Sequence, residues 1–171
     1  SAEESLPPHL PKDTLRVEFF RAASVLGLNK ANLKVFPFEV RRLSEHRQEV
    51  LDTMIRLRNE FEPDLVFLPS SHDIHQDHAV VFAEGLRAFK ACALLGYELP
   101  WNHLTFPTQA FLSVTGEHVE NKWRALREYD SQIQLERLYF SRDFVYGLAR
   151  TRGAQSGNKY AEAFEVLRVT W

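Results

Sequence analysis

The chain has 171 residues, of which 44% are hydrophobic and 26% charged, and its formal net charge at neutral pH is −2. This composition predicts one folded domain over residues 1–171 and excludes long disorder, while the small net charge argues against nucleic acid as a partner. No apolar run approaches the ~20 residues that cross a bilayer. The chain has a single cysteine, Cys92, which excludes an intrachain disulfide and favours a cytoplasmic location.

Residues 1–13 contain three prolines and are expected to be irregular. The predicted elements that follow are, in chain order, a helix over 14–26, a strand over 33–38, a helix over 45–61, a strand over 65–69, a helix over about 77–95, a strand over 105–114, a helix over about 117–134, a helix over 141–152 and a strand over 163–169. Asp13 or Thr14 and Ser44 are suitable N-cap residues for the first two helices, and Gly27 is a stop signal.

Strands that alternate with helices predict an α/β fold, a three-layer sandwich with a mostly parallel, Rossmann-like sheet. The run LVFLP at 65–69 is apolar on both faces, which is typical of a parallel strand covered by helices. In such sheets, ligand sites lie beyond the carboxyl ends of the strands. Residues 70–78 follow this strand directly, so the sequence predicts a site there.

Residues 70–78 read SSHDIHQDH and contain three histidines and two aspartates. His75, Asp77 and His78 form the pattern H-x-D-H, which suits metal binding because imidazole is a good zinc ligand and a carboxylate can fix its tautomer. We expect His78 to bind a divalent metal and His75 to donate a proton or hydrogen bond. Asp77 is expected to orient one of the two histidines.

Asp73 is expected to cap the following helix, with Gln76 supplying the return bond. A catalytic zinc site needs three protein ligands, which this cluster does not supply. The remaining histidines, His9, His46, His103 and His118, show no ligand spacing. The residues alone therefore predict a partial metal site.

Four stretches carry a resemblance to a known family: RVEFFRAASVLG, EPDLVFLPSSHDIHQDH, VENKWRALREYDSQ and YAEAF. In this order they resemble the LmbE-like, or PIG-L-type, zinc-dependent N-acetylglucosaminide deacetylases. The resemblance implies His78 as a zinc ligand, His75 as the group that stabilises the oxyanion or protonates the leaving amine, and Asp77 as an orienting residue. Arg16 is the position that corresponds to a substrate-binding arginine.

The family opens with a strand and the motif Ala-His-Pro-Asp-Asp-Glu, which supplies two further zinc ligands and the general base. This motif does not occur in the 171 residues. The resemblance therefore implies one deacetylase domain that is incomplete at its N-terminus, with the other zinc ligands expected upstream of Ser1. We expect the chain alone to be inactive.

The function predicted is zinc-dependent hydrolysis of the N-acetyl group of a small amino-sugar substrate, with release of acetate. Trp101 follows a proline in a loop and is a candidate wall for the sugar. Two alternatives remain open at this point. The first is a non-catalytic remnant of the deacetylase fold used for binding or assembly. The second is a metal-dependent phosphoesterase, which is less favoured because a two-metal site needs further carboxylates and histidines. A homo-oligomer is compatible with the sequence.

Overall fold

The computed structural model describes residues 10–169, so the predictions for residues 1–9, including the exclusion of His9 as a ligand, lie outside the described residues. The chain divides into two compact units, each built from two stretches. One contains residues up to Pro37 and 112–162, and the other contains 38–111 and the C-terminal stretch from Ala163. Each unit is described by itself below, and the single domain over 1–171 stays a prediction.

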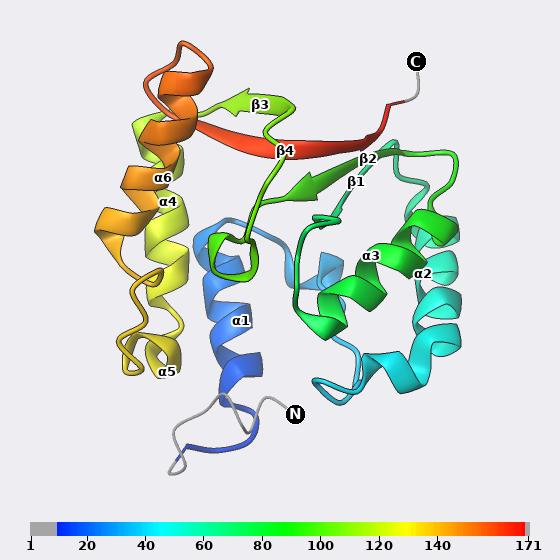
Figure 1. The fold of residues 1–171 in the computed structure, drawn as a ribbon. Coiled ribbons are helices and arrows are strands. Elements are labelled where there is room, and N and C mark those ends of the chain that lie inside the picture. Colours follow the sequence, from blue (N-terminus) through cyan, green and yellow to red (C-terminus); the bar gives the residue numbers. More distant parts are fainter. Residues whose placement is uncertain (1–9, 170–171) are drawn as a thin grey trace. The chain divides into compact units, whose positions relative to one another are not determined.

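In chain order the elements are α1 (Thr14–Val25), the 3-10 helices η2 (Lys30–Asn32) and η3 (Leu43–His46), α2 (Arg47–Phe61), β1 (Leu65–Pro69), α3 (Gln76–Ala88), β2 (Ala93–Tyr97), the 3-10 helix η4 (Pro100–Asn102), β3 (Ala110–Ser113), α4 (Gly116–Arg127), α5 (Asp130–Ile133), α6 (Arg142–Gln155) and β4 (Ala161–Arg168) (Figure 1). The strands form one sheet in the order β1-β2-β4-β3. The predicted α/β class is confirmed. The sheet is mixed, because β1 and β2 are parallel and β2 and β4 are antiparallel.

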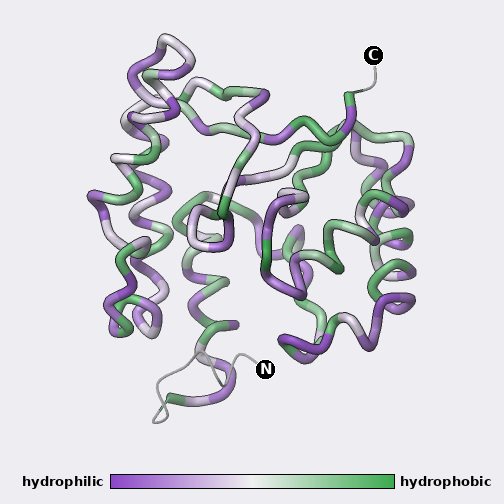
Figure 2. Tube along the Cα trace, in the orientation of Figure 1, coloured by the Kyte–Doolittle hydropathy of each residue, from purple (hydrophilic) through white to green (hydrophobic). Residues whose placement is uncertain are grey.

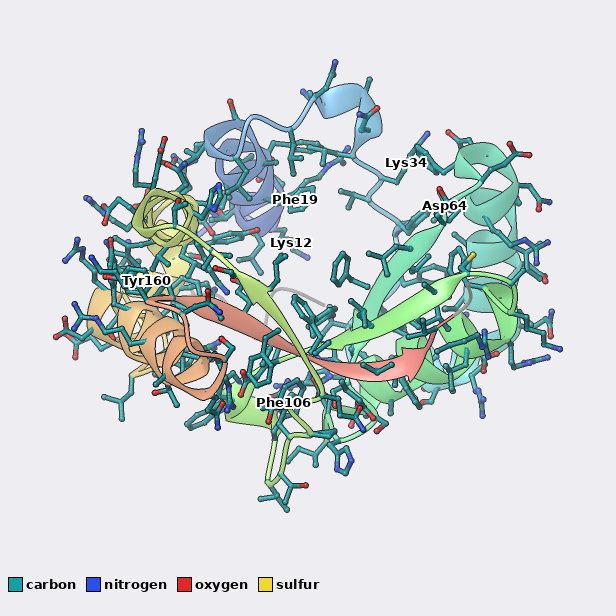
Figure 3. The ribbon with its side chains drawn as sticks, turned by 90° about the horizontal axis from the view of Figure 1, so that it is seen from above. Lys12, Phe19, Lys34, Asp64, Phe106 and Tyr160 are labelled. Carbon is teal, nitrogen blue, oxygen red and sulfur yellow. The ribbon has the colours of Figure 1, made fainter. Side chains whose placement is uncertain are left out.

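The unit that contains β1 and β2 has its core where α2 and α3 pack on these strands (Figure 1). Both strands are mainly hydrophobic along their length (Figure 2). Leu94 of β2 and Ala88 at the end of α3 are fully buried. The start of β1 is joined to the start of β2 by a 2.9 Å hydrogen bond from the Ala93 N–H to the carbonyl of Asp64, which is labelled in Figure 3. This hydrogen bond helps to set the register of β1 against β2, and so the point along the sheet at which β1 ends.

The other unit packs α4 and α6 around Val119, Val145 and Tyr160. A second contact joins α1 to α5 through Glu18, which is only 2% exposed. Its carboxylate accepts hydrogen bonds from the Ser131 N–H at 2.8 Å and the Ser131 hydroxyl at 2.6 Å. These two bonds satisfy a buried carboxylate that would otherwise destabilise the fold. The predicted stop of the first helix is confirmed, since Gly27 has φ +73°.

Several predicted elements differ from the structure: the helix predicted over about 117–134 is two helices, α4 and α5, and the strand predicted over 105–114 is shortened to β3. Residues 33–38 have no regular structure in the described chain, where the predicted strand has no partner to supply ladder hydrogen bonds. The helix predicted over about 77–95 ends at Ala88, and 93–97 is β2. The helix predicted over 141–152 is α6, which continues to Gln155.

Two further expectations need correction. Ser44 is not the N-cap of α2, because it lies inside η3. The expectation that β1 is covered on both faces is wrong at its beginning. Leu65 and Phe67 are 44% and 49% exposed because β1 is at an edge of the described sheet. Among residues 10–169, no helix combines the length and apolar composition that a membrane crossing requires.

Candidate functional site

The turn that follows β1 is anchored by Glu165 of β4, which is 8% exposed. Its carboxylate accepts hydrogen bonds from the Ser70 hydroxyl at 2.7 Å, the Ser71 N–H at 2.8 Å and the Ser71 hydroxyl. The neighbouring residue on β2 is Gly96, where a Cβ would lie 3.0 Å from the Ser70 Cα and 3.1 Å from a Glu165 oxygen. A glycine is therefore needed for the turn and the carboxylate to approach this closely.

Asp73 orients His78. One oxygen of the Asp73 carboxylate accepts from the His75 backbone N–H at 2.8 Å, and the other lies 2.7 Å from His78 Nδ1. The Asp73 side chain is only 1% exposed and the His78 side chain is 30% exposed. Because a carboxylate accepts, His78 donates from Nδ1, and its Nε2 keeps a lone pair. This is the arrangement in which a histidine binds a metal through Nε2.

His75 has the opposite arrangement. It is the N-cap of α3, and its Nδ1 accepts a hydrogen bond from the Asp77 N–H at 3.2 Å. The proton of the neutral ring is therefore on Nε2, which makes that atom a donor. The His75 and His78 rings have centroids 4.6 Å apart. The structure thus brings together one imidazole with a free lone pair and one with a free N–H.

The role of Asp77 in orienting a histidine stays a prediction, but the described hydrogen bonds of its carboxylate go to other residues. Its carboxylate accepts from the backbone N–H of Arg41 at 2.5 Å and of Leu43 at 3.3 Å. Among the described residues, Asp77 contacts a site histidine through its backbone N–H, which donates to His75 Nδ1 at 3.2 Å. Gln76 also differs from the capping role expected of it, because its side-chain amide donates to the Arg41 carbonyl at 2.6 Å. Both side chains hold the segment that precedes α2.

Two residues that sequence reasoning missed come from the segment after β2. The Asn102 carbonyl accepts from the Ile74 N–H at 3.0 Å, and its side-chain nitrogen is 3.4 Å from Asp73. His103 forms a bridge with Asp73 and stacks on Phe106, labelled in Figure 3, at 5.1 Å. Burial lowers the pKa of His103, although the Asp73 charge opposes this effect. No sequence signal linked these residues to the cluster, since β2 was not predicted.

The other predicted site residues are placed as follows. Trp101, in η4, is 70% exposed and directly precedes Asn102, so it lies on a segment that contacts the cluster. Arg16 lies on α1 in the other unit, and its assignment stays a prediction. Among residues 10–169, no group of three or more His, Cys, Asp or Glu side chains is arranged to hold a metal ion. Within the cluster, His78 has the carboxylate partner on Nδ1 and the available Nε2 of a ligand.

Glu165 gives a test of the anchored turn. Burial acts to raise its pKa, but the hydrogen bonds from Ser71 and Ser70 outweigh burial and hold the pKa below the ordinary value. Glu165→Gln replaces an acceptor by a donor, so we expect it to lower the free energy of unfolding at pH 7 by about 1–3 kcal/mol. The loss should shrink as pH falls through the lowered pKa, because protonation then removes the same stabilisation from the wild type.

Urea unfolding at pH 7 and at stepwise lower pH measures this difference. Glu162→Gln is the matched control on the same strand, since Glu162 is 38% exposed and pairs with Lys122 at 2.7 Å. An exposed pair contributes little, so this change should cost less than about 1 kcal/mol. A Glu165→Gln effect that stays constant at every pH would show that the carboxylate charge is not what holds the turn.

The family model described as GlcNAc-PI de-N-acetylase, PIG-L, matches residues 11–90. No curated protein gave a significant match.

Solved structures share the fold. N,N′-diacetylchitobiose deacetylase from Pyrococcus horikoshii is 20% identical to this chain, with a TM-score of 0.63. The match covers 90% of this chain and 63% of the deacetylase chain. Teicoplanin deacetylase Orf2 in its zinc-inhibited form is 21% identical, with a TM-score of 0.63, and the match covers 88% of this chain and 72% of the Orf2 chain. The 4-carboxy-2-hydroxymuconate hydratase GalB from Pseudomonas putida is 20% identical, with a TM-score of 0.69, and the match covers 100% of this chain and 80% of the GalB chain.

The three structures include two deacetylases and one hydratase, so the shared fold by itself does not select a reaction. The matched residues 11–90 include the turn after β1, His75 and His78. The predicted resemblance is therefore confirmed: residues 11–90 carry the pattern of the PIG-L, GlcNAc-PI de-N-acetylase family, on the fold of LmbE-like deacetylases.

Proposed function

We propose that this protein is a zinc-dependent N-deacetylase that hydrolyses the N-acetyl group of an N-acetylglucosamine-containing or related amino sugar. The observation that carries the proposal is the pair of adjacent imidazoles at the carboxyl end of β1, with a lone pair on His78 Nε2 and an N–H on His75 Nε2. Amide hydrolysis needs both an electrophile that activates water and a donor to the departing groups. The family match supports the same reaction.

His78 fits zinc as a ligand, because Asp73 holds its Nδ1 proton and leaves Nε2 available. Bound zinc supplies Lewis-acid chemistry, in that it polarises the amide carbonyl and lowers the pKa of water. Since His78 is one ligand and a catalytic zinc has three from the protein, we place the remaining ligands and the general base on an Ala-His-Pro-Asp-Asp-Glu segment outside these 171 residues.

His75 acts as donor during the reaction. Its Nε2–H donates a hydrogen bond to the oxyanion that forms when water adds to the acetyl carbon. The C–N bond then breaks, and the leaving nitrogen takes the proton that the general base removed from water, so the products are acetate and a free amine while the neutral His75 ring keeps its Nε2 proton. Asp73 keeps the neighbouring ring of His78 in place, and the Asp77 N–H keeps His75 in the donor tautomer.

The substrate wall is proposed at Trp101, whose exposed indole suits the apolar face of a sugar ring. Arg16 remains proposed as a substrate contact, as do the cytoplasmic location and a homo-oligomer. A non-catalytic binding role is not favoured. A binding role alone does not require the buried Asp73 carboxylate to fix the tautomer of the partly exposed His78.

Acetate release from N-acetylglucosamine derivatives in the presence of zinc tests the proposal. We expect release by a longer protein that carries the Ala-His-Pro-Asp-Asp-Glu segment and little or none by the 171-residue chain. Robust release by the 171 residues alone would refute the placement of the missing ligands. Absence of release by the longer, zinc-loaded protein on neutral and charged amino sugars would refute the deacetylase function.

A further inference from the structure

The imidazole of His103 is a buried polar group that the proposed reaction does not use. Both of its ring nitrogens are buried, and neither has a hydrogen-bond partner in the part of the chain that the structure describes. The ring stacks on Phe106, with the two planes 6° apart and the centroids 5.1 Å apart. Buried polar atoms are bonded in the great majority of cases, so an unbonded histidine beside the site calls for an explanation.

A protonated His103 does not fit this environment. The imidazolium would present two N–H donors and a charge where the neutral ring presents one donor. Burial is the largest effect on the pKa of His103 and lowers it below the ordinary value. The charges of Asp73, Glu98 and Glu165 oppose this effect, and the charge of His72 adds to it. Donors from the turn and from α3 already occupy the carboxylates of Asp73 and Glu165.

Residues 98–106, which include His103, join the end of β2 to the chain before β3 and contain the short helix η4. Contacts on both sides of Asp73 hold this segment to the turn after β1. The Asn102 carbonyl accepts from the Ile74 N–H at 3.0 Å. The Thr105 hydroxyl lies 3.1 Å from His72 Nδ1. The segment therefore packs on the site through loop contacts rather than through a continuous strand pair.

Two of the apolar side chains in residues 98–106 bury little area, since Trp101 is 70% exposed and Leu104 is 88% exposed. Segments with little buried apolar area open locally at a lower free energy than the core that supports them. Local opening would also bring the ring of His103 into water, where both of its N–H groups can be hydrated when it is charged.

We propose that residues 98–106 form a pH-sensitive flap, which packs against the turn after β1 while His103 is neutral and opens when this ring takes up a proton. The flap carries Trp101, the proposed sugar wall. It also carries Asn102, whose side-chain nitrogen is 3.4 Å from Asp73. Acid would therefore withdraw both side chains from the site. The switch is a property of the conformation and does not rest on the deacetylase function.

Acid favours the open flap for the following reason. In the open flap, the exposed ring of His103 has the ordinary pKa of about 6.5, whereas in the closed flap burial holds the pKa lower. The closed flap thus has its full stability above pH ~6.5 and loses stability as pH falls from there through the lowered pKa. A single titrating histidine changes the ratio of open to closed molecules by at most about tenfold per pH unit.

Hydrogen exchange of the Ile74 N–H measures the closed flap, because this amide donates to the Asn102 carbonyl. In the complete, metal-free protein, we expect its protection factor, corrected for the intrinsic exchange rate, to fall by ~3–8-fold between pH 7.0 and 5.5. The Ala93 N–H, which is bonded to the Asp64 carbonyl, is the internal control and should keep its protection.

His103→Phe keeps a ring that can stack on Phe106 but has no titrating group. We expect its Ile74 protection to stay constant within about twofold over the same pH range. His103→Leu is the second variant, with a smaller side chain and the same expected result. In both variants the wild-type fall should be absent because the closed flap no longer excludes a proton.

Two other histidines are the matched controls. His72→Gln removes the titrating group on the other side of the flap contact, and His46→Gln removes one that pairs with Glu49 elsewhere in the same unit. Both variants should retain the fall in Ile74 protection. A fall that persists in both His103 variants, or that disappears in His72→Gln, overturns the proposal. Constant Ile74 protection in the wild type, or an equal loss at Ala93, also overturns it.

Discussion

Replacing His78 with alanine in the complete protein is expected to remove bound zinc and to lower kcat by at least ~10³-fold. The imidazole is the metal ligand proposed among the described residues, and one oxygen of the buried Asp73 carboxylate orients it. Several kcal/mol of transition-state stabilisation come from a catalytic metal, and each 1.36 kcal/mol corresponds to a tenfold change in rate. Elemental analysis of the purified variant and acetate release measure the two losses.

His46→Ala is the control for this experiment. His46 is a half-exposed histidine of the same unit, and it pairs with Glu49 at 3.2 Å rather than with the cluster. We expect this variant to keep both zinc and activity. A His78→Ala protein that binds zinc as tightly as the wild type would show that the metal is held elsewhere.

Replacing His75 is expected to give the opposite pattern: zinc is retained and kcat falls by ~10²–10³-fold, which is the usual contribution of one donor to the oxyanion. The reason is the tautomer, since the Asp77 N–H occupies Nδ1 and leaves Nε2–H as the donor. His75 is also the N-cap of α3. His75→Ala alone would therefore mix a loss of capping, about 1 kcal/mol, with a loss of chemistry.

His75→Asn separates the two effects, because asparagine is among the best N-cap residues but lacks the imidazole Nε2–H that donates to the oxyanion. We expect His75→Asn to recover thermal stability relative to His75→Ala without recovering kcat. Zinc content, Tm and kcat are measured on both variants. Zinc loss in His75→Asn equal to that in His78→Ala would contradict the division of roles between the two histidines.

The location of the site was predictable because its signals are local. An apolar run that ends at Pro69 and is followed at once by the cluster predicts a site at the carboxyl end of a strand, and β1 and α3 confirm that arrangement. The strand β2 was not predictable in the same way. Its residues 93–97 continue an apolar pattern that fits a helix, and Gly96 shows its purpose only when Ser70 and Glu165 lie against it.

The partner of each histidine depended on one detail that the sequence does not contain. The helix begins at Gln76, with His75 outside it as the N-cap. Consecutive residues of a helix point about 100° apart, so Asp77 and His78 face different directions. Asp77 therefore reaches Arg41, while Asp73 in the preceding turn reaches His78.

The long-range contacts of the site were also out of reach of sequence reasoning. Glu165 and Ser70 are 95 positions apart, and Asn102 and Asp73 are 29 apart. Neither pair has a motif that links its members. Such contacts follow from strand order and register, because β2 lies between β1 and β4 in the sheet.

The tautomers of His75 and His78 are the most direct test of the proposed site, and long-range ¹H–¹⁵N NMR correlation at a pH where both rings are neutral measures them without metal or substrate. We predict that His78 carries its proton on Nδ1 and that His75 carries its proton on Nε2. In Asp73→Ala, the His78 ring should lose its preference for the Nδ1–H tautomer, while His75 should keep its preference for the Nε2–H tautomer. A His78 ring protonated on Nε2 in the wild type would contradict its assignment as the metal ligand.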